Sequence, residues 1–112
     1  MVSLEYSSYF KKELKRLFKK YKSLQEDVIV LRKSLMENPQ QGTDLGKGYR
    51  KIRMAISSKG KGKRGGARVI TYQIEQKGDD YRICLLMIYD KSEISSVSDR
   101  FLSELANSIS QK

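Results

Sequence analysis

The chain has 112 residues, a net charge of +10 and a mean hydropathy of -0.60. This length predicts a single domain spanning residues 1–112, large enough for its own hydrophobic core. No apolar run approaches the roughly 18 residues of a membrane span, and the first residues lack the pattern of a signal peptide, so we expect a cytoplasmic protein that does not enter a membrane. Because Cys84 is the only cysteine and histidine is absent, an internal disulfide and zinc or iron sites built from His and Cys are excluded.

The first part of the chain predicts a short strand and a helix. Residues 2–6 include a β-branched and an aromatic side chain, which favours a short strand. Ser7 or Ser8 offers a hydroxyl that can cap a helix over residues 9–21. One face of this helix is apolar, and we interpret its basic side chains as a solvated face. They are Lys11, Lys12, Lys15, Arg16, Lys19 and Lys20.

The second helix is predicted to begin at a capping box, in which Ser23 and Glu26 bond free backbone amides. It should stop near Glu37, because Asn38 precedes the only proline and the residue before a proline disfavours the helical region. Its apolar stripe consists of Leu24, Val28, Ile29, Leu31, Leu35 and Met36.

Residues 40–48 are polar and glycine-rich and are predicted to form a loop. Residues 49–56 then alternate as in a strand, with Ile52 and Met54 on one face. Lys51 and Arg53 should lie side by side on the opposite face.

Two more strands are predicted over residues 67–75 and 81–90, joined by a turn. The second is apolar on both faces, which is typical of an interior strand, and Cys84 within it is interpreted as a small buried hydrophobe. Arg68 lies two residues before Ile70, which places it on the more apolar face of its strand unless a bulge near Gly65, Gly66 or Ala67 resets the alternation. The sequence leaves this facing open.

Ser95 or Ser96 is expected to cap a final helix with apolar positions at Ile94, Val97, Phe101, Leu105 and Ile109. The order β-α-α-β-β-β-α predicts an α+β fold with the helices packed on one face of a small antiparallel-rich sheet.

The charge is concentrated in residues 45–74, which contain nine Lys or Arg and no Asp or Glu. The rest of the chain has 14 bases and 13 acids, so this stretch supplies nearly all of the net charge and favours a polyanion such as nucleic acid as the partner. Its loop at residues 57–66 combines four glycines with four bases, which suits phosphate, although the P-loop pattern is absent. The alternative is a solvated hairpin that serves solubility.

Two strings occur together: GKRGGARV at residues 62–69 and I-Y-x-K-x-E at residues 88–93. In this combination the chain resembles the RelE/ParE superfamily of bacterial toxins, and specifically its HigB-type RelE branch. The resemblance implies a RelE-like domain that acts as a ribosome-dependent endoribonuclease and cuts mRNA in the ribosomal A site. It also implies a toxin-antitoxin system, with a tightly bound antitoxin, expected to be a helix-turn-helix protein, encoded by the adjacent gene.

RNA cleavage by attack of the 2′-hydroxyl needs a base, positive charge at the phosphate and a proton for the leaving oxygen, and none of these requires a metal or another cofactor. A crowd of bases can lower the pKa of a Lys or Tyr so that it acts as the base. By resemblance, Lys51 and Arg53 bind phosphate and assist proton transfer, and Arg68 stabilises the scissile phosphate. Tyr89 and Lys91 match the family positions after the last strand. The expected contacts to RNA and the ribosome are Lys47, Arg50, Lys59, Lys61, Lys63 and Arg64.

The family pattern has a later tyrosine, and this chain has none after Tyr89, so the identity of the acid stays open. Structural interpretations stand beside the catalytic ones: Tyr72 and Tyr89 as packing residues, and Asp90, Lys91 and Glu93 as an ion pair and caps at the entry of the last helix. Two other functions stay open as well, a gyrase-poisoning toxin of the ParE type and a noncatalytic RNA-binding protein.

Overall fold

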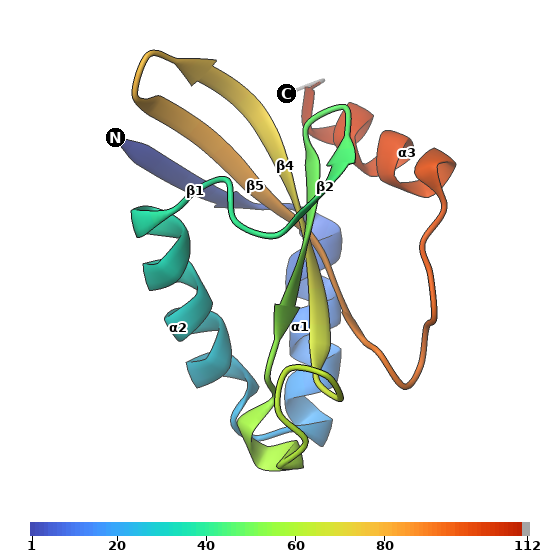
Figure 1. Cartoon of the computed structure of the whole chain (residues 1–112). Coiled ribbons are helices and arrows are strands. Elements are labelled where there is room, and N and C mark those ends of the chain that lie inside the picture. Colours follow the sequence, from blue (N-terminus) through green and yellow to red (C-terminus); the bar gives the residue numbers. More distant parts are fainter. Residues whose placement is uncertain (111–112) are drawn as a thin grey trace.

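The computed structural model describes residues 1–110, which form three α-helices and five strands in one mixed sheet (Figure 1). The helices are α1 (Ser8–Lys20), α2 (Leu24–Glu37) and α3 (Asp99–Ser110). The strands are β1 (Val2–Tyr6), β2 (Thr43–Gly46), β3 (Tyr49–Met54), β4 (Ala67–Lys77) and β5 (Asp80–Asp90), and a 3₁₀ turn, η1 (Ser57–Lys59), lies between β3 and β4. The predicted α+β class is confirmed.

The strand order is β1-β5-β4-β3-β2, with β1 parallel to β5 and the other neighbours antiparallel. The strand that is apolar on both faces, β5, has a neighbour on each side, so its predicted interior position is confirmed. Cys84 on this strand is buried, also as predicted. No helix in the described part of the chain is both long and apolar enough to span a bilayer.

The extra strand β2 lies within residues 40–48, where we predicted only a loop. It pairs with β3 through a turn in which Lys47 and Gly48 have φ of 55° and 89°. Two residues with positive φ match the twist of a tight hairpin. All four residues of β2 are exposed, so the strand carries no hydrophobic alternation from which it could have been predicted.

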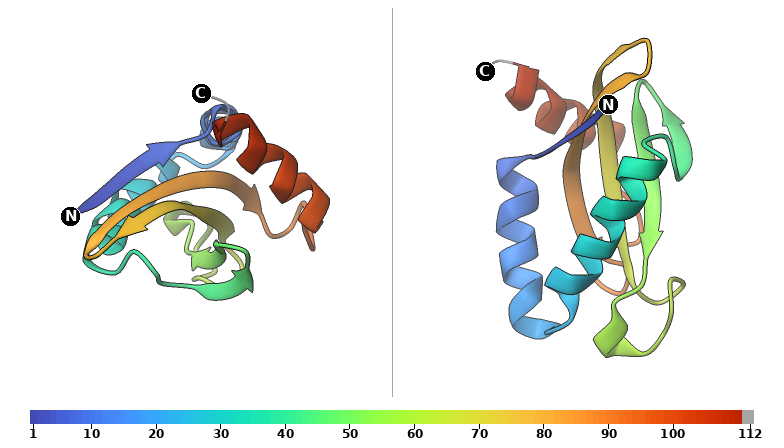
Figure 2. Two further views of the ribbon diagram at one scale, coloured as in Figure 1. Left: turned by 90° about the horizontal axis from the view of Figure 1, so that it is seen from above. Right: turned by 90° about the vertical axis from the view of Figure 1, so that its left-hand side faces the viewer.

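The prediction that all helices share one face of the sheet is wrong. α1 and α2 bury Phe10 and Leu35 against one face, while α3 buries Leu102 against the other. Figure 2 shows α3 separated from α2 by the strands. The physical reason is that β4 and β5 are apolar on both faces, and each apolar face must be covered.

Helix caps follow the sequence only in part. Ser7 caps α1 by accepting a hydrogen bond from the Phe10 amide at 2.9 Å, and α2 ends at Glu37, both as predicted. The capping box at Ser23 does not form. α3 begins later than predicted, and Ser98 accepts from the Phe101 amide at 3.1 Å in place of Ser95 or Ser96.

The apolar stripe of α2 is narrower than predicted. Leu24, Val28, Leu31 and Leu35 are buried, whereas Ile29 and Met36 are 42% and 52% exposed. The adjacent Val30 is 67% exposed. α2 therefore carries apolar side chains on its outer surface as well as toward the core.

Candidate phosphate-binding site

Three predicted site residues form one row across the sheet. Arg53 on β3 is opposite Arg68 on β4, and Arg68 is opposite Tyr89 on β5. Residues directly opposite each other in antiparallel strands project from the same face of the sheet. Arg53, Arg68 and Tyr89 therefore share one face, and we call them the cross-strand row.

The facing of Arg68, which the sequence left open, is settled by this register. The pairing of β3 with β4 is continuous from Tyr49 to Met54, so no bulge lies beside Arg68 in this pair. Arg68 does share the face of Ile70, and that face is also the one on which Lys51 and Arg53 lie. The basic face of β3 and the apolar face of β4 are the same side of the sheet.

Arg53 and Arg68 are a close pair. The Gln73 amide donates to the Gly48 carbonyl at 2.9 Å, which makes these opposing residues a hydrogen-bonded pair. Because such pairs alternate with non-hydrogen-bonded ones, Arg53 and Arg68 belong to the second kind, with Cα atoms about 4.5 Å apart. The main-chain N–H and C=O of Arg53 consequently point away from β4.

Arg68 is only 5% exposed, and its guanidinium holds the neighbouring loop. It donates to the carbonyls of Lys63 at 2.9 Å, Ala67 at 3.0 Å and Arg64 at 3.2 Å. These three hydrogen bonds give Arg68 a structural role beside the catalytic one that the resemblance implies. Arg53, in contrast, is exposed at the outer end of the row.

Tyr89 does not have the lowered pKa that a general base would need. The side chain is 3% exposed, and this burial raises its pKa above the ordinary value, although the nearby Arg68 opposes the shift. The phenol therefore stays protonated at neutral pH. Tyr72, which we considered as a packing residue, packs against Tyr49 with ring centroids 5.1 Å apart.

Hydrogen bonds hold the loop at residues 55–66 at both ends. At its start, Asp27 accepts from the Ser57 amide at 3.0 Å and from its hydroxyl, and Ser23 accepts from the Ser58 amide at 2.9 Å. These tertiary bonds use the Ser23 hydroxyl that the predicted capping box required. At its end, Arg68 holds the loop carbonyls. Hydrogen bonds thus hold the loop at both ends, and the loop leaves Lys61, Lys63 and Arg64 exposed.

Lys59 does not join these exposed bases. Its ammonium is 2.9 Å from the fully buried carboxylate of Asp90, donates to the Gly65 carbonyl at 2.9 Å and lies over the ring of Tyr21. Although burial raises the pKa of Asp90, hydrogen bonds from Tyr21, Lys59 and Ser92 outweigh it and hold this pKa well below the usual range. We call Lys59, Asp90 and Tyr21 the buried network.

Lys91 is exposed just beyond the cross-strand row, and its amide donates to the Gly66 carbonyl at 3.2 Å. Glu93 forms an ion pair at 3.0 Å with Arg16 of α1, which lowers the pKa of Glu93. Because α3 begins only at Asp99, the interpretation of Asp90, Lys91 and Glu93 as a helix entry is wrong.

Two expected RNA contacts lie away from the row. Arg50 projects from the opposite face of β3 and lies 3.8 Å from Asp44, and Lys47 occupies the hairpin turn beyond the other end of β3. The row, with Lys51 and Lys91 beside it and the exposed loop bases next to it, is the part of the predicted site that the fold brings together.

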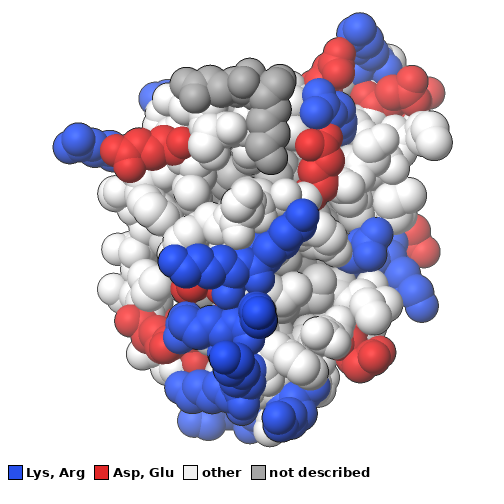
Figure 3. All heavy atoms as spheres, turned by 180° about the vertical axis from the view of Figure 1, so that it is seen from behind, with Lys and Arg blue, Asp and Glu red and all other residues white. Residues whose placement is uncertain are grey.

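The basic side of α1 forms a second concentration of charge. Seen from behind, Lys and Arg gather in a band over the region of α1 (Figure 3). All six bases of α1 are exposed, and within the described residues the ion pairs of this helix involve Arg16. We had interpreted this face as solvated only, and its periodic lysines were the signal that could have marked it as a charged surface.

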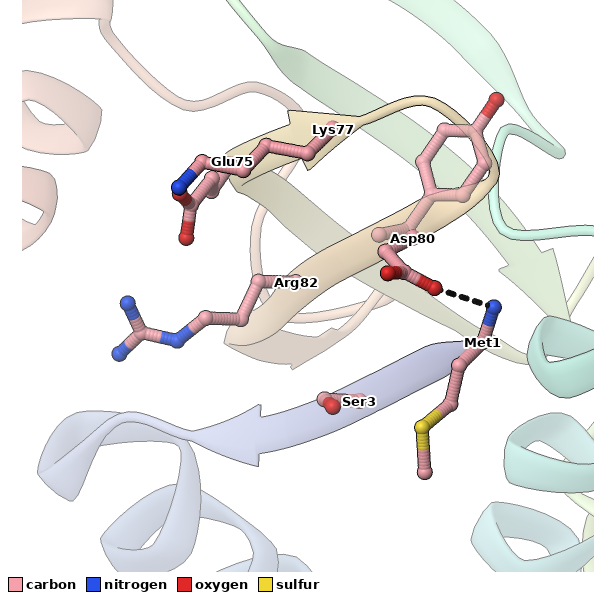
Figure 4. A pocket seen from close by; sticks show the side chains of 7 residues that line it. Met1, Ser3, Glu75, Lys77, Asp80 and Arg82 are labelled. Atoms are coloured by element: carbon pink, nitrogen blue, oxygen red, sulfur yellow. Dashed lines mark hydrogen bonds and ion pairs between the residues drawn. The ribbon is translucent and has the colours of Figure 1, made fainter.

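A pocket at the far end of β4 and β5 has mixed charge. It is lined by Met1, Glu75, Lys77, Asp80 and Arg82 among others (Figure 4). Its charges pair with each other or with near neighbours: the Met1 amino group with Asp80 at 2.8 Å, and Lys77 with Glu75 at 3.2 Å. Such a pocket does not favour a polyanion. In the described residues, no three His, Cys, Asp or Glu side chains are grouped so that they could hold a metal ion.

Fold and site together define a small α+β protein with a row of cationic and phenolic side chains across three strands. No model of a known protein family matches the chain.

Proposed function

We propose that this protein is a RelE-type toxin of the HigB branch, a ribosome-dependent endoribonuclease that cleaves mRNA in the A site and so inhibits translation. The observation that carries the proposal is the cross-strand row with Lys51 and Lys91 beside it. These are the residues that the two sequence strings and the basic strand suggested, and they come from three separate strands.

In the proposed reaction the 2′-oxygen bonds to the neighbouring phosphorus while its proton passes to water. The bond from phosphorus to the 5′-oxygen breaks, and a 2′,3′-cyclic phosphate is left. Arg53 and Lys51 bind the phosphate and stabilise the negative charge that develops on it. Arg68 acts as a positioning residue, because its guanidinium holds the loop that presents Lys63 and Arg64. Lys91, exposed at the end of the row, is the candidate proton donor to the leaving oxygen.

Dependence on the ribosome fits a site of this kind. The accessible groups lie on an open sheet face and a loop, so they offer charge but little enclosure to hold a free RNA strand in the in-line geometry. In the proposal, the ribosome supplies that geometry. The proposed partners are thus the ribosome, its mRNA and an antitoxin from the adjacent gene, and the proposed location is the cytoplasm.

A second function, noncatalytic RNA binding, is favoured by one observation. Arg68 and Tyr89 are 5% and 3% exposed, so neither reaches substrate without a rearrangement. The two functions predict the same salt-dependent RNA binding and differ in whether the bound message is cut.

The test is to add the purified protein to translating ribosomes and to map the 5′ ends of the mRNA. The proposal predicts new ends at A-site codons and an intact message when the same mRNA is supplied without ribosomes. Binding with an uncut message on ribosomes would support the noncatalytic function. Double-strand DNA breaks with intact mRNA would instead support a gyrase poison of the ParE type.

A further inference from the structure

A groove lies between α1 and α2, which diverge from their short link in the right-hand view of Figure 2. Side chains of α1 form most of its lining, with one residue of β1 and one of α2, Gln25, at its borders. Its volume is about 370 Å³, within the roughly 300–1,000 Å³ of small-molecule pockets. The groove is therefore large enough for a small ligand.

The floor of the groove is a straight apolar row. Phe10, Leu14 and Phe18 line it at four-residue spacing, which places them on one face of α1. At a rise of about 1.5 Å per residue the row is about 12 Å long. Tyr6 extends it at one end, because its ring stacks on that of Phe10 with centroids 5.2 Å apart. Such a row fits an extended hydrocarbon chain better than a compact ring.

The apolar floor is partly accessible. Phe10 is fully buried at the base of the row, whereas Tyr6, Leu14 and Phe18 are only partly buried although they pack against the core. A hydrocarbon chain laid along these three side chains would cover apolar surface that water now reaches. Burial of this surface, together with that of the chain itself, favours binding.

The rim of the groove is basic. Lys11 and Lys15 line it from α1, are exposed, and take no part in the ion pairs of the described residues. Within the described chain, the lining contains no Asp or Glu. The one acid of α1, Glu13, lies outside the lining and is 3.3 Å from Arg16. An apolar floor beside two cations suits a ligand with a hydrocarbon chain and an anionic head.

The exposed side of α2 borders the same groove. Ile29 and Arg32 follow Gln25 at four and seven residues, so the three side chains share one helix face. Gln25 lines the groove, and the guanidinium of Arg32 lies 5.6 Å from the ring centroid of Tyr6. Ile29, which is 42% exposed, lies between them and can cover a bound chain from this side.

The groove and the cross-strand row are on opposite sides of the sheet. α1 and α2 pack on the face that carries Ile52 and Val69. Because successive side chains of a strand alternate, Arg53 and Arg68 project from the other face. A ligand between α1 and α2 leaves the row open, so the groove is a separate site and does not depend on the proposed function.

We propose that this groove binds a medium-chain fatty acid that is free in solution. The hydrocarbon chain lies along Leu14 and Phe18 beneath Ile29, where each methylene group removed from water adds affinity. The carboxylate accepts charge-assisted hydrogen bonds from the ammonium groups of Lys11 and Lys15.

The binding test titrates the whole ¹⁵N-labelled chain with decanoate below its micelle concentration. The control ligand is decyltrimethylammonium, which has a chain of the same length and the opposite charge. We expect decanoate to shift the amide resonances of Leu14, Phe18 and Gln25, and the control to leave them unchanged. No binding of decanoate, equal shifts with the control, or shifts confined to the cross-strand row would overturn the proposal.

A series of shorter ligands tests the apolar floor without any change to the protein. From decanoate through octanoate to hexanoate, affinity should fall by up to about fourfold for each methylene group removed, the equivalent of about 0.8 kcal/mol. A carboxylate held by lysines alone would bind equally at every chain length. Equal affinity across the series would therefore contradict the proposed site.

Two double variants of α1 separate the rim of the groove from general charge effects. Lys11→Glu/Lys15→Glu replaces both rim cations and should weaken decanoate by about tenfold or more, since attraction becomes repulsion. Lys12→Glu/Lys19→Glu is the matched control: it changes the net charge equally, and both lysines are exposed outside the lining. At about 0.15 M salt, where exposed charges act over only about 8 Å, the control should bind within about twofold of the wild type. Equal loss in both variants would refute a carboxylate at the rim.

Two other occupants of the groove give different results in the same spectra. A second copy of the chain would shift Leu14 and Phe18 as the concentration of the protein alone is raised. A membrane surface would be indicated if anionic phospholipid vesicles bound through α1 while decanoate did not. Either result would overturn the proposal, whereas decanoate shifts that are independent of protein concentration and sensitive to Lys11→Glu/Lys15→Glu would support it.

Discussion

Arg53 and Arg68 are directly opposite on β3 and β4, yet Arg53 is exposed and Arg68 is 5% exposed. Like charges directly across two strands destabilise a sheet. Three carbonyls accept hydrogen bonds from Arg68 and offset this cost, and the same bonds fix the loop that carries Lys63 and Arg64. Arg68 thus holds the loop in place, whereas Arg53 stays accessible to a ligand.

Arg68→Lys should weaken the fold, because an ammonium keeps the charge but lacks the planar fork that reaches several carbonyls. We expect the free energy of unfolding to fall by about 1–3 kcal/mol, measured by urea denaturation. Arg53→Ala, at an exposed position, should stay within about 0.5 kcal/mol of the wild type. Arg68→Ala should relieve growth arrest on expression while the protein remains folded, and wild-type toxicity of this variant would refute its role.

Asp90→Ala should be the most destabilising of the single substitutions considered. It leaves the ammonium of Lys59, whose side chain is 12% exposed, without its buried partner. Removing one member of a buried pair costs about 3–5 kcal/mol. Thermal or urea unfolding checks this value, and the double variant Lys59→Met/Asp90→Leu should recover part of the loss because it removes both charges. An Asp90→Ala variant as stable as the wild type would show that the buried network contributes little.

Stability should fall in acid through Asp90. Its pKa is lowered in the folded protein, so the carboxylate contributes stability that is complete above the unfolded pKa of about 3.9 and is lost as the pH falls toward the folded pKa. Between about pH 4 and pH 2 the wild type should therefore lose stability more steeply than Asp90→Asn. Asp79→Asn, at an exposed turn, is the control and should follow the wild-type slope.

Binding of single-stranded RNA should depend on salt through the exposed loop bases. Removing one cation that neutralises a phosphate should reduce the slope of log K against log salt by about 0.7. Replacing Lys61, Lys63 and Arg64 by alanine should thus reduce the slope by about 2, in filter-binding or fluorescence titrations over a range of salt. Lys59→Ala should leave the slope of log K against log salt unchanged, because the charge of Lys59 is paired with Asp90. An unchanged slope in the triple variant would place the RNA elsewhere, for instance on α1.

Sequence patterns predicted the elements whose signal is periodic. The buried positions Leu24, Val28, Leu31 and Leu35 of α2, the interior strand β5 and the shared face of Lys51 and Arg53 all depend on helical or alternating spacing. The structure confirms these three predictions, whereas Ile29 and Met36, which the α2 stripe also included, are exposed. β2 carries no such pattern, since its residues are exposed and its pairing depends on a turn with positive φ.

Features that depend on distant partners were not predictable in this way. The Ser23 hydroxyl accepts a hydrogen bond from the amide of Ser58, 35 residues away. The capping box that local spacing predicted at Ser23 therefore does not form. Lys59 meets Asp90 across 31 residues and changes from an expected RNA contact into part of the buried network. The cross-strand row likewise needs the register of three strands, which alternation within each strand does not provide.

The most direct test of the proposed site compares mRNA cleavage on translating ribosomes by the wild type, Lys51→Ala, Arg53→Ala and the control Lys77→Ala, whose side chain is 82% exposed at the far end of β4. Loss of a group that stabilises charge in the transition state typically costs about 10²–10³ in rate. We predict a loss of this order for Lys51→Ala and Arg53→Ala, with folding intact and Lys77→Ala fully active. Cleavage by Arg53→Ala at the wild-type rate would contradict the account.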